Sequence, residues 1–220
     1  MSNLKALDDK IKLTEKRVLV RVDLNVPISS GKVSDNSKIK KITPLITNLI
    51  EKKAKIILIS HLGRPKGRFD KKLSLKPVAL ALQELMKTKI EFFEKSYGPE
   101  AIEKSKKIKP GEILLLENIR FNKEEELNTE SFSKELSKIG DIYINEAFAC
   151  SHRAHASVCE ITNHIDSFAG RMLIEEVNLI KMLTSNPQKP VTCIIGGSKI
   201  SSKIGILINL IKKVQTIVIV

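Results

Sequence analysis

Apolar residues recur at every second position in the segment 17–24: Val18, Val20, Val22 and Leu24. This spacing and the β-branched side chains indicate a β-strand. Leu19, which lies between two of these positions, is also apolar. The first half of the strand is therefore expected to be buried on both faces, as in a parallel sheet.

Strand and helix patterns then alternate along the rest of the chain. Strands are predicted near 17–24, 55–60, 90–93, 112–116, 141–145, 191–195 and 216–220. Helical periodicity fills the intervening segments 38–52, 75–87, 99–106, 129–139, 172–184 and 200–214. Repeated βα units predict an α/β fold with a doubly wound, Rossmann-like parallel sheet and right-handed crossovers.

The first strand ends in polar residues. Arg21, Asp23 and Asn25 are two residues apart, so they project from one face near its carboxyl end. Pro27 then marks the exit into a loop. Buried polar groups need partners, which leaves two alternatives: an internal Arg21–Asp23 ion pair, or a ligand site at the carboxyl edge of the sheet.

Basic residues also follow the later strands. The loop after 55–60 contains His61, Gly63, Arg64 and a further lysine and arginine, while Arg120 and Arg153 follow the strands 112–116 and 141–145. Carboxyl ends of parallel strands meet at one edge, so these side chains predict a shared anion pocket. A catalytic Cys150–His152 pair is rejected, because a spacing of two residues does not aim the side chains at each other.

Composition narrows the class of protein. The net charge is +13, with 42% hydrophobic and only 4% aromatic residues and no Trp. Anionic partners are therefore expected, but stacking platforms for nucleic acid are scarce, and no run approaches a membrane span. Three cysteines without a CxxC pair favour a reducing compartment, so we expect a cytoplasmic protein that binds neither nucleic acid nor membrane.

Six ordered motifs resemble those of phosphoglycerate kinases. They are Arg-x-Asp-x-Asn-x-Pro at 21–27, Ser-His-Leu-Gly-Arg-Pro at 60–65, Ser-Leu-x-Pro-Val at 74–78, Leu-Leu-Glu-Asn-x-Arg-Phe at 115–121, Ala-Phe at 147–148 with His-Arg-Ala-His-Ala-Ser at 152–157, and Gly-Gly-Ser-Lys-Ile-Ser-x-Lys at 196–203. The resemblance implies reversible phosphoryl transfer between 1,3-bisphosphoglycerate and ADP, giving 3-phosphoglycerate and ATP. It also implies Mg²⁺ carried by the nucleotide, and a monomer of two α/β domains.

The resemblance also assigns roles to individual residues. It implies substrate contacts from Arg21, Asp23, Asn25, Lys38, His61, Leu62, Gly63, Arg64, Arg120 and Arg153. Arg120 and Arg153 would hold the distant phosphate, a role suited to the guanidinium fork. Gly196, Gly197, Lys199 and Lys203 would bind the nucleotide, and Lys38, Lys199 and Lys203 would act on the phosphoryl group being transferred.

Two residues depart from the family's pattern. Lys38 stands where the family has an arginine regarded as catalytic, and lysine keeps the charge but lacks the planar fork. We therefore expect weaker transition-state stabilisation at this position, or compensation by Lys40 or Lys41. Glu146 replaces an aspartate, which adds one methylene.

The resemblance predicts three regions: a phosphoglycerate-binding domain at 1–170, an interdomain hinge helix at 171–189, and the start of a nucleotide-binding domain at 191–220. The chain stops in the apolar run 216–220, at a point where the family continues into a Gly-rich loop. We therefore expect an amino-terminal fragment that is inactive alone. The alternative is a non-catalytic protein of this length that binds 3-phosphoglycerate or another anion.

Overall fold

The computed structural model describes residues 4–8, 11–185, 187–197 and 204–220. The chain forms two compact units, Met1–Ile174 and Glu175–Val220. The strands of the first unit are β1 (Arg17–Arg21), β2 (Ile28–Ser29), β3 (Lys32–Val33), β4 (Lys55–Ile59), β5 (Ile90–Phe93), β6 (Ile113–Leu116), β7 (Ile142–Asn145) and β8 (Ser167–Ala169).

Helices connect these strands. The α-helices are α1 (Ser37–Glu51), α2 (Lys76–Met86), α3 (Pro99–Lys107), α4 (Lys123–Glu126) and α5 (Glu130–Ser137), and α6 (Arg171–Ser185) begins in the first unit. Short 3₁₀ helices are η1 (Lys71–Leu73), η2 (Ile119–Phe121), η3 (Phe148–Cys150) and η4 (Glu160–Asn163).

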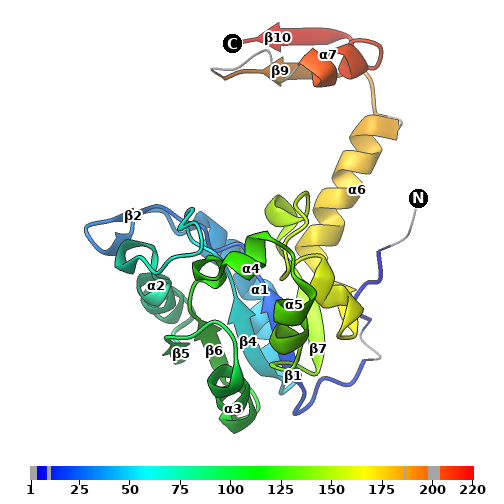
Figure 1. Ribbon diagram of the computed structural model, residues 1–220. Coiled ribbons are helices and arrows are strands. Elements are labelled where there is room, and N and C mark those ends of the chain that lie inside the picture. Colours follow the sequence, from blue (N-terminus) through cyan, green and yellow to red (C-terminus); the bar gives the residue numbers. More distant parts are fainter. Residues whose placement is uncertain (1–3, 9–10, 186, 198–203) are drawn as a thin grey trace. The chain divides into compact units, whose positions relative to one another are not determined.

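Six of the strands form one sheet in the order β5-β6-β4-β1-β7-β8, and every pairing in it is parallel. The first strand of the chain therefore lies at the centre of the sheet (Figure 1). The register places Arg21 beside Ile59 of β4 and Asn145 of β7. This alignment brings the ends of three strands to one edge.

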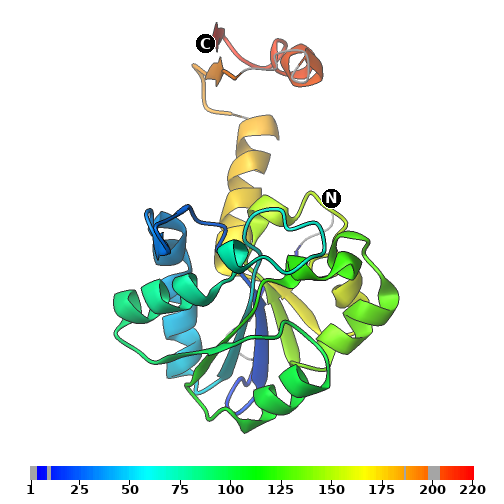
Figure 2. The ribbon, with the colours of Figure 1, turned by 60° about the vertical axis from the view of Figure 1, so that its left-hand side comes forward.

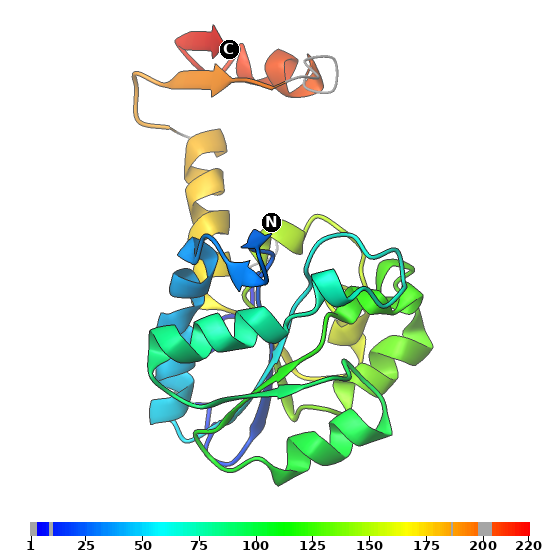
Figure 3. The same ribbon diagram turned by 90° about the vertical axis from the view of Figure 1, so that its left-hand side faces the viewer.

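Both faces of the sheet are buried. One face packs against α1 and α2 through alternate residues such as Val18 and Val20, whereas Leu19 points into the core beneath α3 and α5 on the other face. Figures 2 and 3 show these helices on opposite sides of the sheet. The doubly wound parallel sheet is thus confirmed.

The loops at the carboxyl edge diverge. Those leaving β1 and β4 lead to helices on one face, whereas those leaving β6 and β7 lead to elements packed on the other. These four strands are neighbours in the sheet, so the chain changes face both between β6 and β4 and between β1 and β7. Ligands of open α/β sheets bind at such points.

The strand predicted at 17–24 ends earlier, at Arg21. Beyond it the backbone N–H of Leu24 donates to Ser60 Oγ at 2.9 Å, so a side chain replaces the ladder of the sheet. Val22 and Leu24 nevertheless remain fully buried. The alternating pattern therefore detected burial correctly, and overestimated the strand by three residues.

The second unit contains two parallel strands, β9 (Thr192–Ile195) and β10 (Thr216–Ile219), joined through α7 (Ile204–Leu210). The predicted helix at 200–214 begins among residues that the structure does not describe, and its described part is shorter than expected. Its two strands lie where the sequence pattern predicts strands, at 191–195 and 216–220, whereas the assignment of 191–220 to a nucleotide-binding domain stays a prediction.

Candidate active site

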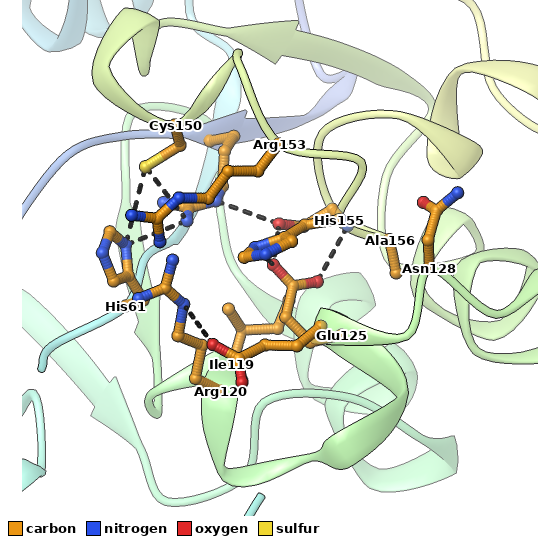
Figure 4. Close-up of polar contacts among 12 residues, drawn as sticks. His61, Ile119, Arg120, Glu125, Asn128, Cys150, Arg153, His155 and Ala156 are labelled. Atoms are coloured by element: carbon orange, nitrogen blue, oxygen red, sulfur yellow. Dashed lines mark hydrogen bonds and ion pairs between the residues drawn. The ribbon is translucent and has the colours of Figure 1, made fainter. Parts of the chain in front are cut away.

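Four basic side chains, one at the end of a strand and three from the loops after other strands, meet at the carboxyl edge of the sheet. We call Arg21, His61, Arg120 and Arg153 the basic cluster. Arg21 ends β1, His61 follows β4, Arg120 lies in η2 after β6, and Arg153 follows η3 after β7. Figure 4 shows His61, Arg120 and Arg153 directed toward one another. The convergence predicted from the sequence is present.

Arg21 is completely buried, and its guanidinium is held by three groups. Nε donates to Ser157 Oγ at 3.0 Å, Nη1 to the carbonyl of Val22 at 2.6 Å, and Nη2 lies 3.0 Å from His61 Nδ1. The carboxylate of Asp23 pairs with Lys38 instead. The internal Arg21–Asp23 ion pair is therefore wrong, because each partner is engaged elsewhere.

His61 is buried within the cluster. Burial lowers its pKa to about 2, and the positive charges of Arg21, Arg120, Arg153 and Lys38 add to the effect. Each of these factors disfavours the charged imidazolium. His61 therefore contributes hydrogen-bonding capacity without charge.

Arg120 is the least satisfied member of the cluster. Its Nη1 donates to the carbonyl of Gly63 at 3.1 Å, and Nε lies 3.5 Å from Oε1 of Glu126. Among the described residues, Nε and Nη2 are buried without a hydrogen-bond partner. Burial lowers the pKa of Arg120; Glu126 opposes this shift, and the charge of Arg21 reinforces it. A buried guanidinium with free donors is costly unless an anion meets it.

A second group of contacts joins the loop after β1 to α1 and to the loop after β4. Asp23 Oδ2 accepts from Lys38 Nζ at 2.8 Å, which ties the loop after β1 to the first turn of α1. Asn25 Oδ1 accepts from the backbone N–H of Gly63 at 2.9 Å. Gly63 has φ +62, a conformation that favours glycine.

The other predicted substrate residues differ in exposure. Arg64 is exposed, and Arg153 is partly buried with Nε donating to His152 Nε2 at 3.1 Å. Leu62 is buried in the core, and its carbonyl accepts from Asn118 Nδ2 at 2.8 Å. Leu62 thus anchors the loop through its side chain and its carbonyl.

Cys150 lies beside the basic cluster. Its Sγ is 3.8 Å from both His61 Nδ1 and Arg21 Nη2, and the thiol is buried. His152 is exposed and contacts Arg153. The rejected Cys150–His152 pair is therefore not formed.

Sequence reasoning missed the groups that support the cluster. Glu125 is completely buried and accepts from both the backbone N–H and the hydroxyl of Ser157, at 2.8 Å and 2.7 Å. Glu117 accepts from Ser74 Oγ at 2.6 Å and from the backbone N–H of Leu75 at 2.8 Å. Glu117 and Ser157 lie inside the recognised motifs, whereas Glu125 carries no comparable signal.

The predicted nucleotide residues lie in the second unit. Gly197 has φ +123, whereas a Cβ on Gly196 would approach Val220 Cγ2 to 2.7 Å. A side chain at position 196 would therefore crowd Val220, the residue that follows β10. Lys199 and Lys203 lie outside the described residues.

Two further observations concern the described part of the chain. Its His, Cys, Asp and Glu side chains form no group suited to holding a metal ion. Its helices include none with both the length and the apolar character needed to cross a bilayer.

Comparison with known proteins identifies the family. The family model for phosphoglycerate kinase matches residues 8–220. A phosphoglycerate kinase of Leptospira biflexa is 49% identical over 94% of this chain, and one of Finegoldia magna is 46% identical over 99%. The chain spans about half the length of these relatives, 52% and 55% respectively.

Solved structures agree with the sequence relatives. The phosphoglycerate kinase of Coxiella burnetii superposes with a TM-score of 0.84 at 36% identity, covering 99% of this chain and 54% of that protein. The enzyme of Pyrococcus horikoshii gives 0.88 at 28% identity, covering 96% of this chain and 54% of that protein. The order of the motifs, the parallel sheet and these matches agree, and the chain belongs to the phosphoglycerate kinase family.

Proposed function

We propose that this chain provides the phosphoglycerate-binding part of an enzyme that transfers a phosphoryl group reversibly between 1,3-bisphosphoglycerate and ADP. The supporting observation is the buried guanidinium of Arg120, whose Nη2 has no hydrogen-bond partner among the described residues. A phosphate oxygen would supply the missing acceptor, and its charge would offset the repulsion within the basic cluster.

Arg120 and Arg153 are suited to the phosphate that is not transferred. They come from loops after β6 and β7, and their planar guanidinium groups bind phosphate through paired N–H donors. Arg64, exposed in the loop after β4, adds positive charge that attracts the ligand. Substitution by lysine would keep the charge and lose the paired geometry.

The remaining groups are suited to the glycerate portion. Asp23 and Asn25 present a carboxylate and an amide next to the cluster, where they can pair with a hydroxyl. The backbone around Leu62 and Gly63 holds His61 beside Arg21. In the proposed role, Lys38 exchanges part of its contact with Asp23 for the ligand's negative charge.

The chemistry itself needs positioning and positive charge rather than a nucleophilic side chain. A β-phosphate oxygen of ADP attacks the phosphorus of the acyl phosphate, and the bond to the carboxyl oxygen breaks to leave a carboxylate. Lys38, Lys199 and Lys203 are the proposed cations for this step. Gly196 and Gly197 would position the nucleotide, which carries its own Mg²⁺ as part of the substrate.

The proposal places the protein in the cytoplasm as a monomer. It excludes nucleic acid and membranes as partners. Scarce aromatic residues, which leave few stacking platforms for nucleic acid, support the exclusion of nucleic acid.

Calorimetric titration of the 220-residue chain with 3-phosphoglycerate tests the binding role. We expect binding by the native chain, a loss of at least about tenfold in Arg120→Lys and a larger loss in Arg120→Met, since a hydrogen bond to a charged group contributes about 1.5–3 kcal/mol. Lys107→Met is the matched control, because Lys107 is exposed at the end of α3, which precedes β6 and so lies at the other edge of the sheet. Equal losses of affinity in Arg120→Met and in the control Lys107→Met would overturn the proposal. Absence of binding by the native chain would overturn it as well.

A further inference from the structure

A continuous chain of hydrogen bonds runs from helix α4 to His61. It begins at Glu125, whose Oε1 lies 2.7 Å from Ser157 Oγ, passes from Ser157 Oγ to Arg21 Nε at 3.0 Å, and ends at Arg21 Nη2, 3.0 Å from His61 Nδ1. Glu125, Ser157 and Arg21 are each completely buried. Burial therefore keeps water from competing for the hydrogen bonds of these three residues.

The direction of each hydrogen bond follows from the chemistry of the groups. A guanidinium has donors and no acceptor, so Ser157 Oγ must accept from Arg21. The hydroxyl has one proton, which it donates to Glu125. Glu125 also accepts the backbone N–H of Ser157 at 2.8 Å, so both of its oxygens fix Ser157.

The same reasoning applies to the hydrogen bond between Arg21 and His61. Since Arg21 Nη2 can only donate, His61 Nδ1 must accept, and the imidazole proton is on Nε2. Cys150 Sγ is farther from Nδ1, at 3.8 Å, and is the weaker partner. Within the part of the chain that the structure describes, Nε2 has no hydrogen-bond partner and remains available to a ligand.

We propose that Glu125 and Ser157 are positioning residues that orient Arg21 and thereby fix His61 as an uncharged hydrogen-bond donor through Nε2. The inference deepens the proposed function and rests on it for the identity of the ligand, an oxygen acceptor of phosphoglycerate. In this arrangement the arginines contribute positive charge, and His61 contributes a hydrogen-bond donor of fixed orientation.

Fixing His61 in this way makes its contribution independent of pH over the range in which a free histidine titrates. The groups that act on it are Arg21 from β1, Lys38 from α1, Arg120 from η2, and Cys150 and Arg153 from the loop after β7. Burial and the four cations all favour the neutral ring. Ligand affinity should therefore show no change attributable to His61 between pH 5 and pH 8, roughly the range over which free histidine titrates.

The test is nitrogen-15 NMR of the imidazole rings in the 220-residue chain, with His61 assigned through His61→Gln. In the native chain we expect an unprotonated Nδ1 and a protonated Nε2 that do not titrate between about pH 5 and pH 8. Ser157→Ala removes the acceptor of Arg21 Nε, so His61 should show mixed tautomers or begin to titrate. Affinity for 3-phosphoglycerate should fall about tenfold.

Matched variants separate positioning from loss of packing. Ser133→Ala is the control, because Ser133 is also completely buried and donates to the carbonyl of Ala156 at 3.3 Å without touching Arg21. Its His61 spectrum and affinity should equal those of the native chain. Glu125→Gln keeps an acceptor for the Ser157 hydroxyl and should retain most of the native His61 spectrum, unlike Glu125→Ala.

The outcomes distinguish the two proposals. If the native chain fails to bind 3-phosphoglycerate while Ser157→Ala still changes the His61 spectrum, the ligand assignment is wrong and the positioning role stands. A native His61 that titrates near the ordinary histidine pKa, or a spectrum unchanged in Ser157→Ala, overturns the positioning role.

Discussion

Lys38 Nζ lies 2.8 Å from Oδ2 of Asp23, and this contact connects the first turn of α1 to the loop that follows the central strand. The Lys38 side chain is 41% exposed and that of Asp23 is 17% exposed. The pair is therefore accessible to a ligand, and each partner has hydrogen-bonding capacity left for one.

Replacing Lys38 with arginine tests the departure from the family's pattern. In a form of the protein that shows phosphotransferase activity, we expect Lys38→Arg to raise kcat by roughly tenfold, because the planar fork can contact two oxygens of the moving phosphoryl group. Steady-state kinetics with both substrates saturating is the measurement. Lys40→Arg is the control, since Lys40 lies near Asp35 rather than Asp23. An unchanged kcat in Lys38→Arg would count against the idea, as would an equal gain in Lys40→Arg.

The low pKa of His61 makes stability depend on pH. This pKa is about 2 in the folded chain, against an ordinary value of 6.5. Between these values the unfolded chain binds a proton that the folded chain does not, so the free energy of unfolding falls as pH decreases below 6.5. From pH 7 to pH 5 the loss due to His61 should be about 2 kcal/mol.

Urea unfolding of the native chain and of His61→Gln at both pH values measures this loss. His61→Gln removes the titrating group and should show a pH dependence smaller by that amount. Equal pH dependence in the two proteins would mean that His61 binds a proton in the folded state.

Gly63 is required by its backbone conformation and by its contacts. Gly63→Ala combines φ +62 with a Cβ placed 2.7 Å from Leu73 Cδ2, so we expect destabilisation of about 1–2 kcal/mol and weaker phosphoglycerate binding. Gly31→Ala is the matched control, because φ is +74 there and the space is open. It carries the backbone cost alone, and its ligand affinity should be native. If the Gly63→Ala variant binds 3-phosphoglycerate as tightly as the Gly31→Ala variant does, this loop has no role in the site.

Gly170 makes room for the carboxylate of Glu146. An added Cβ would lie 1.8 Å from Glu146 Oε2, while Oε1 accepts the backbone N–H of Met172 at 3.2 Å. Gly170→Ala should destabilise the first unit by about 2–3 kcal/mol, because a buried carboxylate must move from its partner. Glu146→Asp shortens the side chain by one methylene and should relieve part of this cost.

A double-mutant cycle by urea unfolding measures that relief. The doubly substituted chain should be more stable than the sum of the single effects by about 1 kcal/mol or more. Additive effects would show that Glu146 does not oppose the new methyl group.

Much of the fold followed from the sequence because its pattern reports burial directly. Val18 and Leu19 predicted a strand with two buried faces, and both are fully buried. The hairpin of β2 and β3 was missed, since its strands have two residues each and its turn at Ser30 and Gly31 is short. The end of the first domain was predicted at residue 170, whereas the first compact unit of the structure ends at Ile174. The domain boundary stays a prediction.

The site was predictable as far as position along the chain determines it. Arg21 ends β1, whereas Arg120 and Arg153 follow β6 and β7, and parallel pairing brings such positions together. The partner of Arg21 was not predictable. Asp23 is close to Arg21 in sequence, but the hydrogen bond is made with Ser157, which lies more than a hundred residues away along the chain. Glu125 lies in a run of three glutamates, a pattern typical of a solvated helix face, and only tertiary packing shows that it is buried.

The position of β1 at the centre of the sheet has a consequence for how the chain folds. One neighbour, β4, follows within 40 residues, whereas the other, β7, begins at Ile142, and the backbone at Lys5 pairs with β8 at Ala169. During synthesis the edge of β1 that pairs with β7 stays unpaired until most of the domain has been synthesised. Such distant pairings slow folding and expose an apolar strand edge to wrong partners. The edge of β1 that pairs with β7 is therefore a site for wrong strand pairing until residues 142–145 have been synthesised.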